Sequence, residues 1–268
     1  MRICLSLFLL LPLLHSSVTE ASTIAPTKGL THYSSSPLGA GVGAANKTHM
    51  LVLKCPINEK QITMSRVAVL NVKDGARDDI ALVTGHGIAN EDGVFEKGCF
   101  VQDFEGKSRK VKSVRLAPNY VSGTSSDWGL IKFSRIRTKN LVRYPMEVAE
   151  VLVNQDGHHL LPTRFSTARG MPENGQDCAI IPRKYSGLKG TGFSGVLAHN
   201  CLAMSGQSGS PFSSKTDDLL GIHIGSTWSL ASQFTGEPGH QGFLRLFDST
   251  MVEEISTLIQ DMKDADKR

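Results

Sequence analysis

A serine stands between two glycines in the stretch MSGQSGSPF, residues 204 to 212. Glycine reaches backbone angles that other residues avoid, so the stretch predicts a tight turn that presents the hydroxyl group of Ser208. A serine hydroxyl is a weak nucleophile until a base takes its proton and a third group orients that base. The chemistry that this turn could support is therefore nucleophilic catalysis, provided that the chain supplies both partners.

Two other segments offer the base and the orienting acid. His86 lies between glycines in ALVTGHG, and Asp127 begins the segment DWGLIKF; both segments contain an apolar run typical of a buried strand. Taken singly, His86 is explained as a structural histidine and Asp127 as a turn cap. Together with Ser208 they predict a catalytic triad in the chain order His, Asp, Ser. Surface or structural roles are expected for His32, His49, His158, His159, His199 and His240.

Short apolar runs, separated by Gly, Asp, Asn and Pro, must position these three residues. Such spacing is typical of a protein with many short strands. Two series of about six runs lie on either side of residues 138–145, which resemble a linker, and they predict an all-β chain of two halves. The runs are MLVLKC, RVAVLNV, IALVTGH, GCFVQDF, KVKSVRLA and WGLIKF, then EVAEVLVN, CAIIPRK, GFSGVLAHNCLAM, DLLGIHIG and HQGFLRLF.

A C-terminal amphipathic helix is expected over residues 248–268. Thr250 and Glu253 have the spacing of a capping box. An apolar face that should pack on the core comprises Val252, Ile255, Leu258, Ile259 and Met262.

The N-terminal segment predicts export. Residues 1–21 combine Arg2, a short apolar run and then small residues, the pattern of a secretory signal peptide. Residues 22–49 are rich in Ser, Thr, Gly, Ala and Pro, which predicts a flexible lead or a propeptide. We therefore expect a secreted, extracellular protein with no membrane anchor once the signal is removed. Asn46 lies in the one glycosylation sequon.

Composition argues against several other classes of function. The 268 residues are 40% hydrophobic and 20% charged, as in ordinary globular proteins, and the net charge is only +4. The basic run over residues 107–112 lacks interleaved aromatic residues, so no nucleic-acid partner is expected. No metal site is expected either, because the chain has neither a Cys-x-x-Cys nor a His-x-x-x-His motif.

Four cysteines remain after the predicted signal peptide, at positions 55, 99, 178 and 201. An even number in an exported protein predicts two disulfides, and three connectivities are possible. Pairing Cys55 with Cys99 and Cys178 with Cys201 is favoured because each pair then lies within one half of the chain. Four buried free thiols are the alternative.

The motifs ALVTGHG, SDWGLIKF and GQSGSP, followed by LLGIHIGS and a terminal helix, resemble the trypsin/chymotrypsin-like serine peptidase superfamily. The likeness is greatest to the glutamyl endopeptidase branch. It covers residues 50–262 and implies one peptidase domain of two antiparallel six-stranded β-barrels, over 50–137 and 146–247, followed by the C-terminal helix. It also implies a peptide or protein substrate, no cofactor and a monomer.

Carried over by position, the resemblance makes Ser208 the nucleophile, His86 the general base and then acid, and Asp127 the group that orients His86. The backbone N–H groups of Gly206 and Ser208 would form the oxyanion hole. Trypsin-like zymogens place an aspartate just before the nucleophile, to pair with a newly cut N-terminus. Gln207 occupies that position here, so this mode of activation is not expected.

Substrate preference is less well specified by the sequence. In the glutamyl endopeptidase branch, the residue at the position of His223 binds an acidic side chain, and Ser205 and Ser226 could assist here. Leu202 and Ala203 favour an apolar or small side chain instead, and a buried structural role would also explain His223.

The expected function is a secreted serine endopeptidase that forms an acyl-enzyme on Ser208. A secreted, catalytically silent homologue that binds other molecules is the alternative, and a peptidase held latent by residues 22–49 is a further one. An α/β-hydrolase esterase fits poorly, since GQSGS lacks the last glycine of Gly-x-Ser-x-Gly.

Overall fold

The structure is a computed structural model. It describes residues 51–266 apart from 59–60, 73–76, 91–92, 95–97, 104, 138–140, 149–151, 154–158, 161–179, 182–193, 200–205, 214–217 and 228–240. The predicted signal peptide and lead therefore lie outside the described residues. So do Asn46, Cys178, Cys201 and Ser205.

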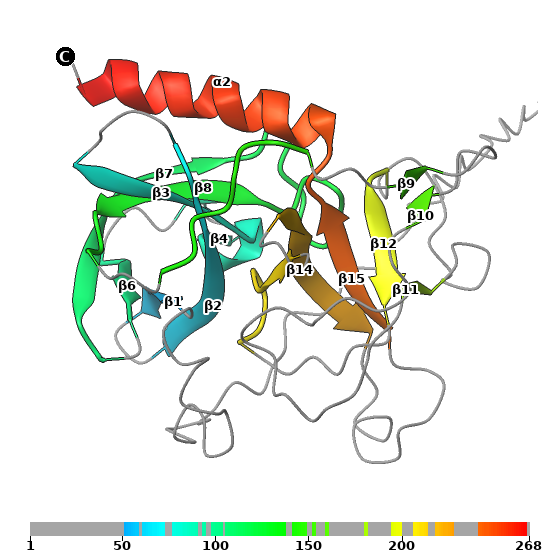
Figure 1. The fold of residues 1–268 in the computed structure, drawn as a ribbon. Coiled ribbons are helices and arrows are strands. Elements are labelled where there is room, and N and C mark those ends of the chain that lie inside the picture. Colours follow the sequence, from blue (N-terminus) through cyan, green and yellow to red (C-terminus); the bar gives the residue numbers. More distant parts are fainter. Residues whose placement is uncertain are drawn as a thin grey trace, which may run out of the picture.

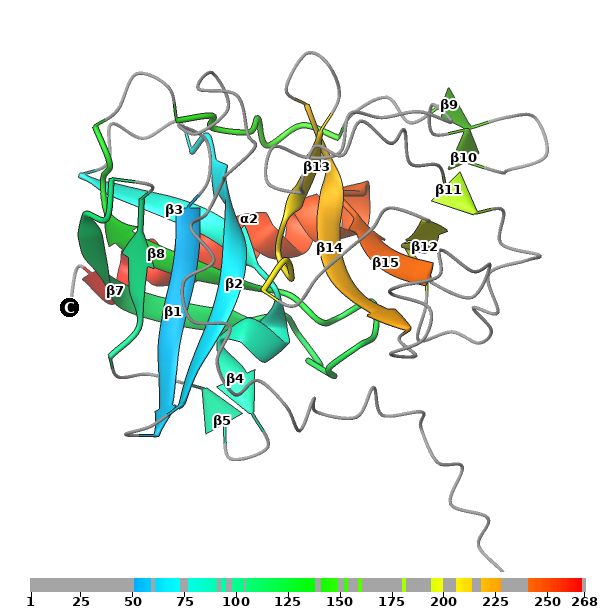
Figure 2. The same ribbon diagram turned by 90° about the horizontal axis from the view of Figure 1, so that it is seen from below.

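The N-terminal half is a closed barrel of six antiparallel strands in the order β1-β2-β3-β8-β7-β6 (Figures 1 and 2). Each strand coincides with one of the first six predicted runs, and alternate apolar side chains such as Leu53, Val101 and Phe133 fill the interior. The predicted first barrel is thereby confirmed. Its strands are β1 (Leu51–Asn58), β2 (Gln61–Leu70), β3 (Asp78–Val83), β6 (Phe100–Gln102), β7 (Ser108–Leu116) and β8 (Gly129–Ser134).

The C-terminal half contains an antiparallel sheet in the order β11-β12-β15-β14-β13, with a separate β9-β10 ladder. Strand β13 begins directly after the Ser208 turn, and the sequence did not predict it because its three residues are too short for a strand pattern. The strands of this half are β9 (Leu152–Val153), β10 (His159–Leu160), β11 (Ile180–Ile181), β12 (Val196–His199), β13 (Pro211–Ser213), β14 (Leu219–Thr227) and β15 (Gln241–Leu246).

The segment that joins the two halves is bound to the first barrel. Arg143 Nη2 lies 3.0 Å from Asp79 Oδ2, and the same carboxylate oxygen accepts a hydrogen bond from the Ile136 amide at 2.8 Å. The Tyr144 amide donates to the Val69 carbonyl at 2.8 Å. The part of the predicted linker that the structure describes is therefore anchored by an ion pair and by backbone hydrogen bonds.

Helix α2 (Ser249–Asp266) begins beside β15 and lies across the first barrel (Figure 1). The predicted apolar face is confirmed: Ile255, Ile259 and Met262 are buried, and Met251 joins them. These side chains belong to a core cluster that includes Leu70 of the first barrel and Phe243 of the second sheet. The helix thus covers the boundary between the two halves.

The cap of this helix differs from the prediction. Asp248 Oδ1 accepts a hydrogen bond from the Met251 amide at 2.9 Å, so Asp248, rather than Thr250, is the N-cap. Arg245 Nη1, which lies 2.6 Å from Asp248 Oδ2, holds the carboxylate in place. The predicted Thr250–Glu253 capping box is wrong because this ion pair starts the helix two residues earlier.

Replacing Asp248 with alanine should therefore lower the free energy of unfolding by about 2 kcal/mol, since the helix loses its cap and the buried Arg245 loses its carboxylate. The matched control is Thr250→Ala, which should change stability by less than about 0.5 kcal/mol. Urea unfolding of both variants measures the difference. An equal loss of unfolding free energy in the two variants would support the Thr250–Glu253 capping box instead.

Figure 1 also shows β4 (Ala89–Asn90), which pairs with β5 (Gly93–Val94) in a small hairpin. The hairpin follows the short 3-10 helix η2 (Gly85–Gly87), which carries His86.

Candidate active site

His86 and Asp127 form a two-point contact. His86 Nδ1 lies 2.8 Å from Asp127 Oδ2, and the backbone amide of His86 donates to Asp127 Oδ1 at 2.9 Å. The side chain of Asp127 is fully buried, whereas that of His86 is 34% exposed. A neutral His86 that donates from Nδ1 to the carboxylate carries the basic lone pair on Nε2. A ring held in this way can accept a proton at Nε2.

Antiparallel pairing of β3 with β8 brings these two residues together. The register places Val83, at the end of β3, opposite Gly129, at the start of β8. His86 lies three residues beyond Val83, and Asp127 lies two residues before Gly129. The pairing of the end of β3 with the start of β8 therefore brings together residues that are 41 positions apart in the chain.

The Asp127 carboxylate is held on both oxygens. In addition to the His86 contacts, Asp127 Oδ2 accepts a hydrogen bond from the Gly123 amide at 2.7 Å. Burial, followed by the charge of Asp127, raises the pKa of nearby Tyr120 to about 12, so the phenol stays protonated. The carboxylate therefore has little freedom to rotate away from His86.

The pKa of His86 reflects two opposing effects. Burial lowers the pKa, while the charge of Asp127 and the hydrogen bond with it raise it, and the net pKa is above the ordinary 6.5. A raised pKa means that His86 holds its proton to a higher pH than a free imidazole. Above that pKa the ring is neutral and able to accept a proton.

The serine turn has the backbone geometry that the glycines suggested. Gly206 and Gly209 both have left-handed backbone angles, with φ of 87° and 83°. A side chain at Gly209 would also collide with the carbonyl oxygen of Arg66, so glycine is required there on two grounds. The Ser210 amide donates to the Gln207 carbonyl at 2.9 Å and closes the turn around Ser208.

Strand β2 links this turn to the histidine turn. The Arg66 amide donates to the Ser208 carbonyl at 2.7 Å. The preceding residue, Ser65, packs against Gly87, the neighbour of His86: a Cβ added at Gly87 would lie 2.7 Å from Ser65 Oγ. Consecutive residues of one strand therefore contact the Ser208 turn and the His86 turn.

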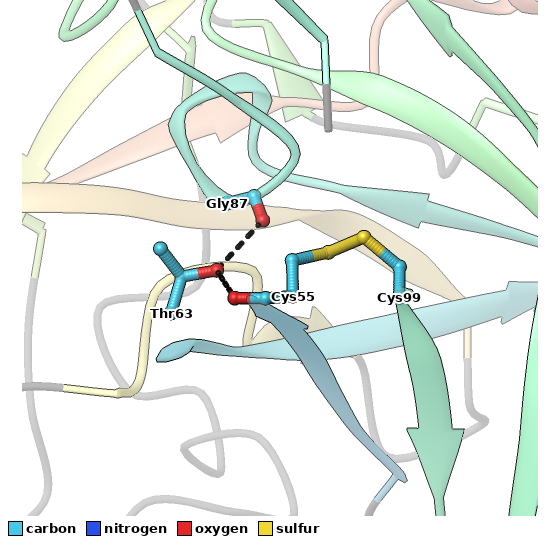
Figure 3. Close-up of a disulfide and its surroundings, with 4 residues drawn as sticks. All are labelled: Cys55, Thr63, Gly87 and Cys99. Atoms are coloured by element: carbon cyan, nitrogen blue, oxygen red, sulfur yellow. Dashed lines mark hydrogen bonds between the residues drawn. A yellow bond between two sulfur atoms is a disulfide. The ribbon is translucent and has the colours of Figure 1, made fainter. Parts of the chain in front are cut away.

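A disulfide supports the same strand. Cys55 on β1 is bonded to Cys99, the pairing that the sequence favoured for the first half. Thr63 Oγ1 on β2 lies 3.2 Å from the Cys55 carbonyl oxygen and 3.3 Å from that of Gly87 (Figure 3). The hydroxyl thus connects the disulfide-bearing strand to the turn that carries His86.

Comparison with known proteins bears on the fold. No protein-family model and no curated protein matches the sequence. The structure of HL collagenase matches with a TM-score of 0.58 at 14% identity, over 83% of this chain and 96% of that chain. Protease Anisep from Arthrobacter nicotinovorans matches with a TM-score of 0.52 at 9% identity, over 78% of this chain and 94% of that chain. The chain has the trypsin-like fold. Membership of the glutamyl endopeptidase branch stays a prediction from the sequence.

Within this trypsin-like fold, His223 lies on β14 next to the serine turn. The Gly209 amide donates to the His223 carbonyl at 2.7 Å, and the side chain of His223 is buried. His223 Nδ1 lies 3.1 Å from Nε2 of His199, which is also buried and was expected only in a surface or structural role. Ser226 lies farther along β14. A pattern search could not have found His199, because its burial against His223 depends on the pairing of distant strands.

Arg245 is a second residue whose role the sequence did not predict. Its Nε donates to the Ser125 carbonyl at 2.8 Å, two residues before Asp127, while its Nη1 pairs with Asp248 at the start of α2. The guanidinium is buried. Arg245 therefore ties the loop that carries Asp127 to the second half of the trypsin-like fold.

No group of His, Cys, Asp or Glu within the described ranges is arranged to hold a metal ion. Among the helices that the structure describes, none is both long enough and apolar enough to cross a bilayer.

Proposed function

We propose that this protein is a secreted serine endopeptidase that cleaves peptide bonds through an acyl-enzyme on Ser208. The observation that carries the proposal is the buried Asp127 carboxylate hydrogen-bonded to Nδ1 of a partly exposed His86. A histidine fixed in this way has its Nε2 free to act as a base. The predicted nucleophile lies on the adjoining turn, connected to the His86 turn through β2.

The proposed reaction has two halves. Nε2 of His86 takes the proton of the Ser208 hydroxyl as Oγ attacks the peptide carbonyl, and Asp127 stabilises the imidazolium that forms. The backbone N–H groups of Gly206 and Ser208 stabilise the oxyanion, and His86 then protonates the leaving amine. Water then attacks the acyl-enzyme with His86 as the base, and His86 returns the proton to Ser208 as the acid product leaves. These three side chains and two amides account for the whole reaction.

A fluorophosphonate probe tests this proposal directly, because only an activated serine reacts with it. We expect intact-mass analysis of the purified protein to show one adduct, and peptide mapping to assign it to Ser208. The full-length chain and a form that begins near Met50 should both be tested, since residues 22–49 could act as a propeptide. An absence of labelling in both forms would favour the catalytically silent binding homologue.

The proposal extends to a preference for glutamate before the cut. The buried His223–His199 pair lies beside the Ser208 turn. Two hydrogen-bonded imidazole rings can hold a proton, and the resulting N–H group can donate a hydrogen bond to a substrate carboxylate. Ser226 on β14, with Ser205, would supply further donors.

We expect peptides with Glu before the cut to be cleaved about tenfold faster, in kcat/KM, than matched peptides with Gln, because one ionic hydrogen bond is worth roughly 1.5 kcal/mol or more. His223→Gln should bring the ratio close to one. Peptides with Leu and Arg at that position complete the profile. Equal rates for Glu and Gln in the wild-type protein would rule out the acidic pocket and favour an apolar or small residue there.

A further inference from the structure

Arg66 on β2 is a partly exposed arginine with two guanidinium nitrogens that are shielded from solvent. Its Nε and Nη1 atoms are inaccessible to solvent, and within the described part of the chain neither has a hydrogen-bond partner. Burial lowers the pKa of Arg66 to about 10, and no acidic group among the described residues opposes this shift. The guanidinium is therefore still charged at neutral pH, although nothing described neutralises it.

Such an arrangement is unfavourable unless it has a use. Buried polar atoms are nearly always hydrogen-bonded, and leaving them unpaired destabilises a fold. Arg143 and Arg245, the other buried or partly buried arginines discussed above, each contact a carboxylate. Arg66 differs from both, which suggests that its counter-ion arrives with a ligand.

The strand pattern of β2 shows where the Arg66 side chain lies. Alternate residues point to opposite faces of a strand. Val67 and Val69 belong to the core inside the first barrel, whereas Ala68 and Leu70 belong to the cluster shared with the second half. Arg66 lies on the same face as Ala68 and Leu70, on the outside of the barrel and toward the second half.

Met64 marks the solvent end of the same face. It is 46% exposed, and its Cε lies 4.0 Å from the position that a Cβ would occupy on Gly206. Arg66 therefore lies between an exposed residue beside the Ser208 turn and the buried boundary of the two halves. Its own amide is bonded to the Ser208 carbonyl. A group bound at the turn would therefore lie close to Arg66.

The two sides of the turn differ in what they offer a substrate. His223 of β14 bonds to the turn from the second half, on the side proposed above for the acyl part of the substrate. Arg66 bonds to it from the first barrel, which also carries His86, the group that would protonate the leaving amine. Arg66 is thus on the leaving-group side.

We propose that Arg66 binds a substrate carboxylate on the leaving-group side of the cut bond. The carboxylate is either an acidic side chain one or two residues after the cut or the free C-terminus of a short substrate. This inference rests on the proposed function and adds a second acidic preference, separate from that at His223.

Peptide pairs that differ only by Glu or Gln after the cut test the proposal, with the residue before the cut held constant. We expect the wild-type protein to favour Glu about tenfold or more in kcat/KM, as a charge-assisted hydrogen bond would give. Arg66→Met should bring the ratio close to one, and Arg66→Lys should give an intermediate value. The matched control is Arg109→Met, which removes a surface arginine of β7 and should keep the wild-type ratio. A ratio unchanged in Arg66→Met would overturn the proposal.

The two carboxylate sources are separated by peptides with the same sequence and either a free or an amidated C-terminus. If the C-terminus is the ligand, amidation should remove the Arg66-dependent advantage in short peptides. If a side chain is the ligand, amidation should leave the Glu over Gln ratio unchanged.

Thermal unfolding without peptide gives an independent readout. Because Arg66→Met removes two shielded nitrogen atoms that lack hydrogen-bond partners, its Tm should equal or exceed that of the wild-type protein. A clear fall in Tm would mean that the chain itself holds the guanidinium, which would contradict a site kept for a ligand.

Binding to the Ser208→Ala variant separates this inference from the proposed function. Fluorescence anisotropy would compare labelled peptides that carry Glu or Gln at the position after the cut, with and without the added Arg66→Met change. Tighter, Arg66-dependent binding of the Glu peptide, together with a wild-type protein that hydrolyses no peptide, would retain the carboxylate site and reject the peptidase. Hydrolysis with no Arg66-dependent preference would do the opposite.

Discussion

Replacement of Ser208 with alanine is expected to lower kcat by about 10⁶-fold, because removing the nucleophile of a serine peptidase triad leaves only the catalysis that binding and the oxyanion hole provide. KM should change little, since the Ser208 hydroxyl contributes little to ground-state binding. Labelling by the fluorophosphonate probe should vanish. Steady-state hydrolysis of a quenched peptide, with enzyme concentrations high enough to detect the residual rate, measures the loss.

Ser210→Ala is the matched control for this prediction. Ser210 lies two residues farther along the same turn and is fully buried, and its Oγ has no hydrogen-bond partner within the described residues. Removing that hydroxyl should therefore leave the fold intact and keep probe labelling at the wild-type level. If Ser208→Ala kept a rate within tenfold of the wild type, another residue would have to be the nucleophile.

Asp127→Asn is expected to lower kcat by about 10⁴-fold, the loss typical of this replacement in such triads. Both Asp127 oxygens accept hydrogen bonds from backbone amides, those of His86 and Gly123. An asparagine has one oxygen and one NH₂ group, so one of those amides would face another donor. If the NH₂ group faces His86 Nδ1, the ring must carry its proton on Nε2, and that tautomer cannot take the serine proton.

The pH dependence of the same variant provides a second test. In the wild-type protein the base must be neutral, so kcat/KM should rise with pH through a His86 pKa above 6.5. Loss of the Asp127 charge removes the main effect that raises this pKa, so the rising limb of the residual activity should move to lower pH. Asp78→Asn is the control, because Asp78 pairs with Lys112 at the surface, away from His86. A rising limb at the same pH in Asp127→Asn would mean that the group titrating is not His86.

The raised pKa of His86 also predicts a stability effect. The protonated ring is favoured by Asp127 in the folded state, so the pair adds stability at pH values below 6.5. That contribution declines as the pH rises through the folded-state pKa. Below pH 6.5 we therefore expect the protein to lose activity because His86 is protonated, while the His86–Asp127 pair still stabilises the fold.

The sequence by itself determined the features that depend on local pattern. Alternating apolar residues marked the six strands of the first barrel, and the 3.6-residue repeat marked the buried face of α2. The types and order of His86, Asp127 and Ser208 suggested one kind of chemistry before any contact between them was known. Patterns of this kind are readable because neighbouring residues of one element share a face.

Only the tertiary structure decided the contacts between residues far apart in the chain. Arg245 donates a hydrogen bond to the Ser125 carbonyl, 120 positions away in the chain. Its ion pair with Asp248 explains why Asp248, rather than Thr250, caps the helix. The burial of His199 against His223, and the contact of Arg66 with the Ser208 turn, likewise arise where separate strands meet. The free energy of a charged or polar side chain depends on what the rest of the fold packs around it, and no local pattern encodes those surroundings.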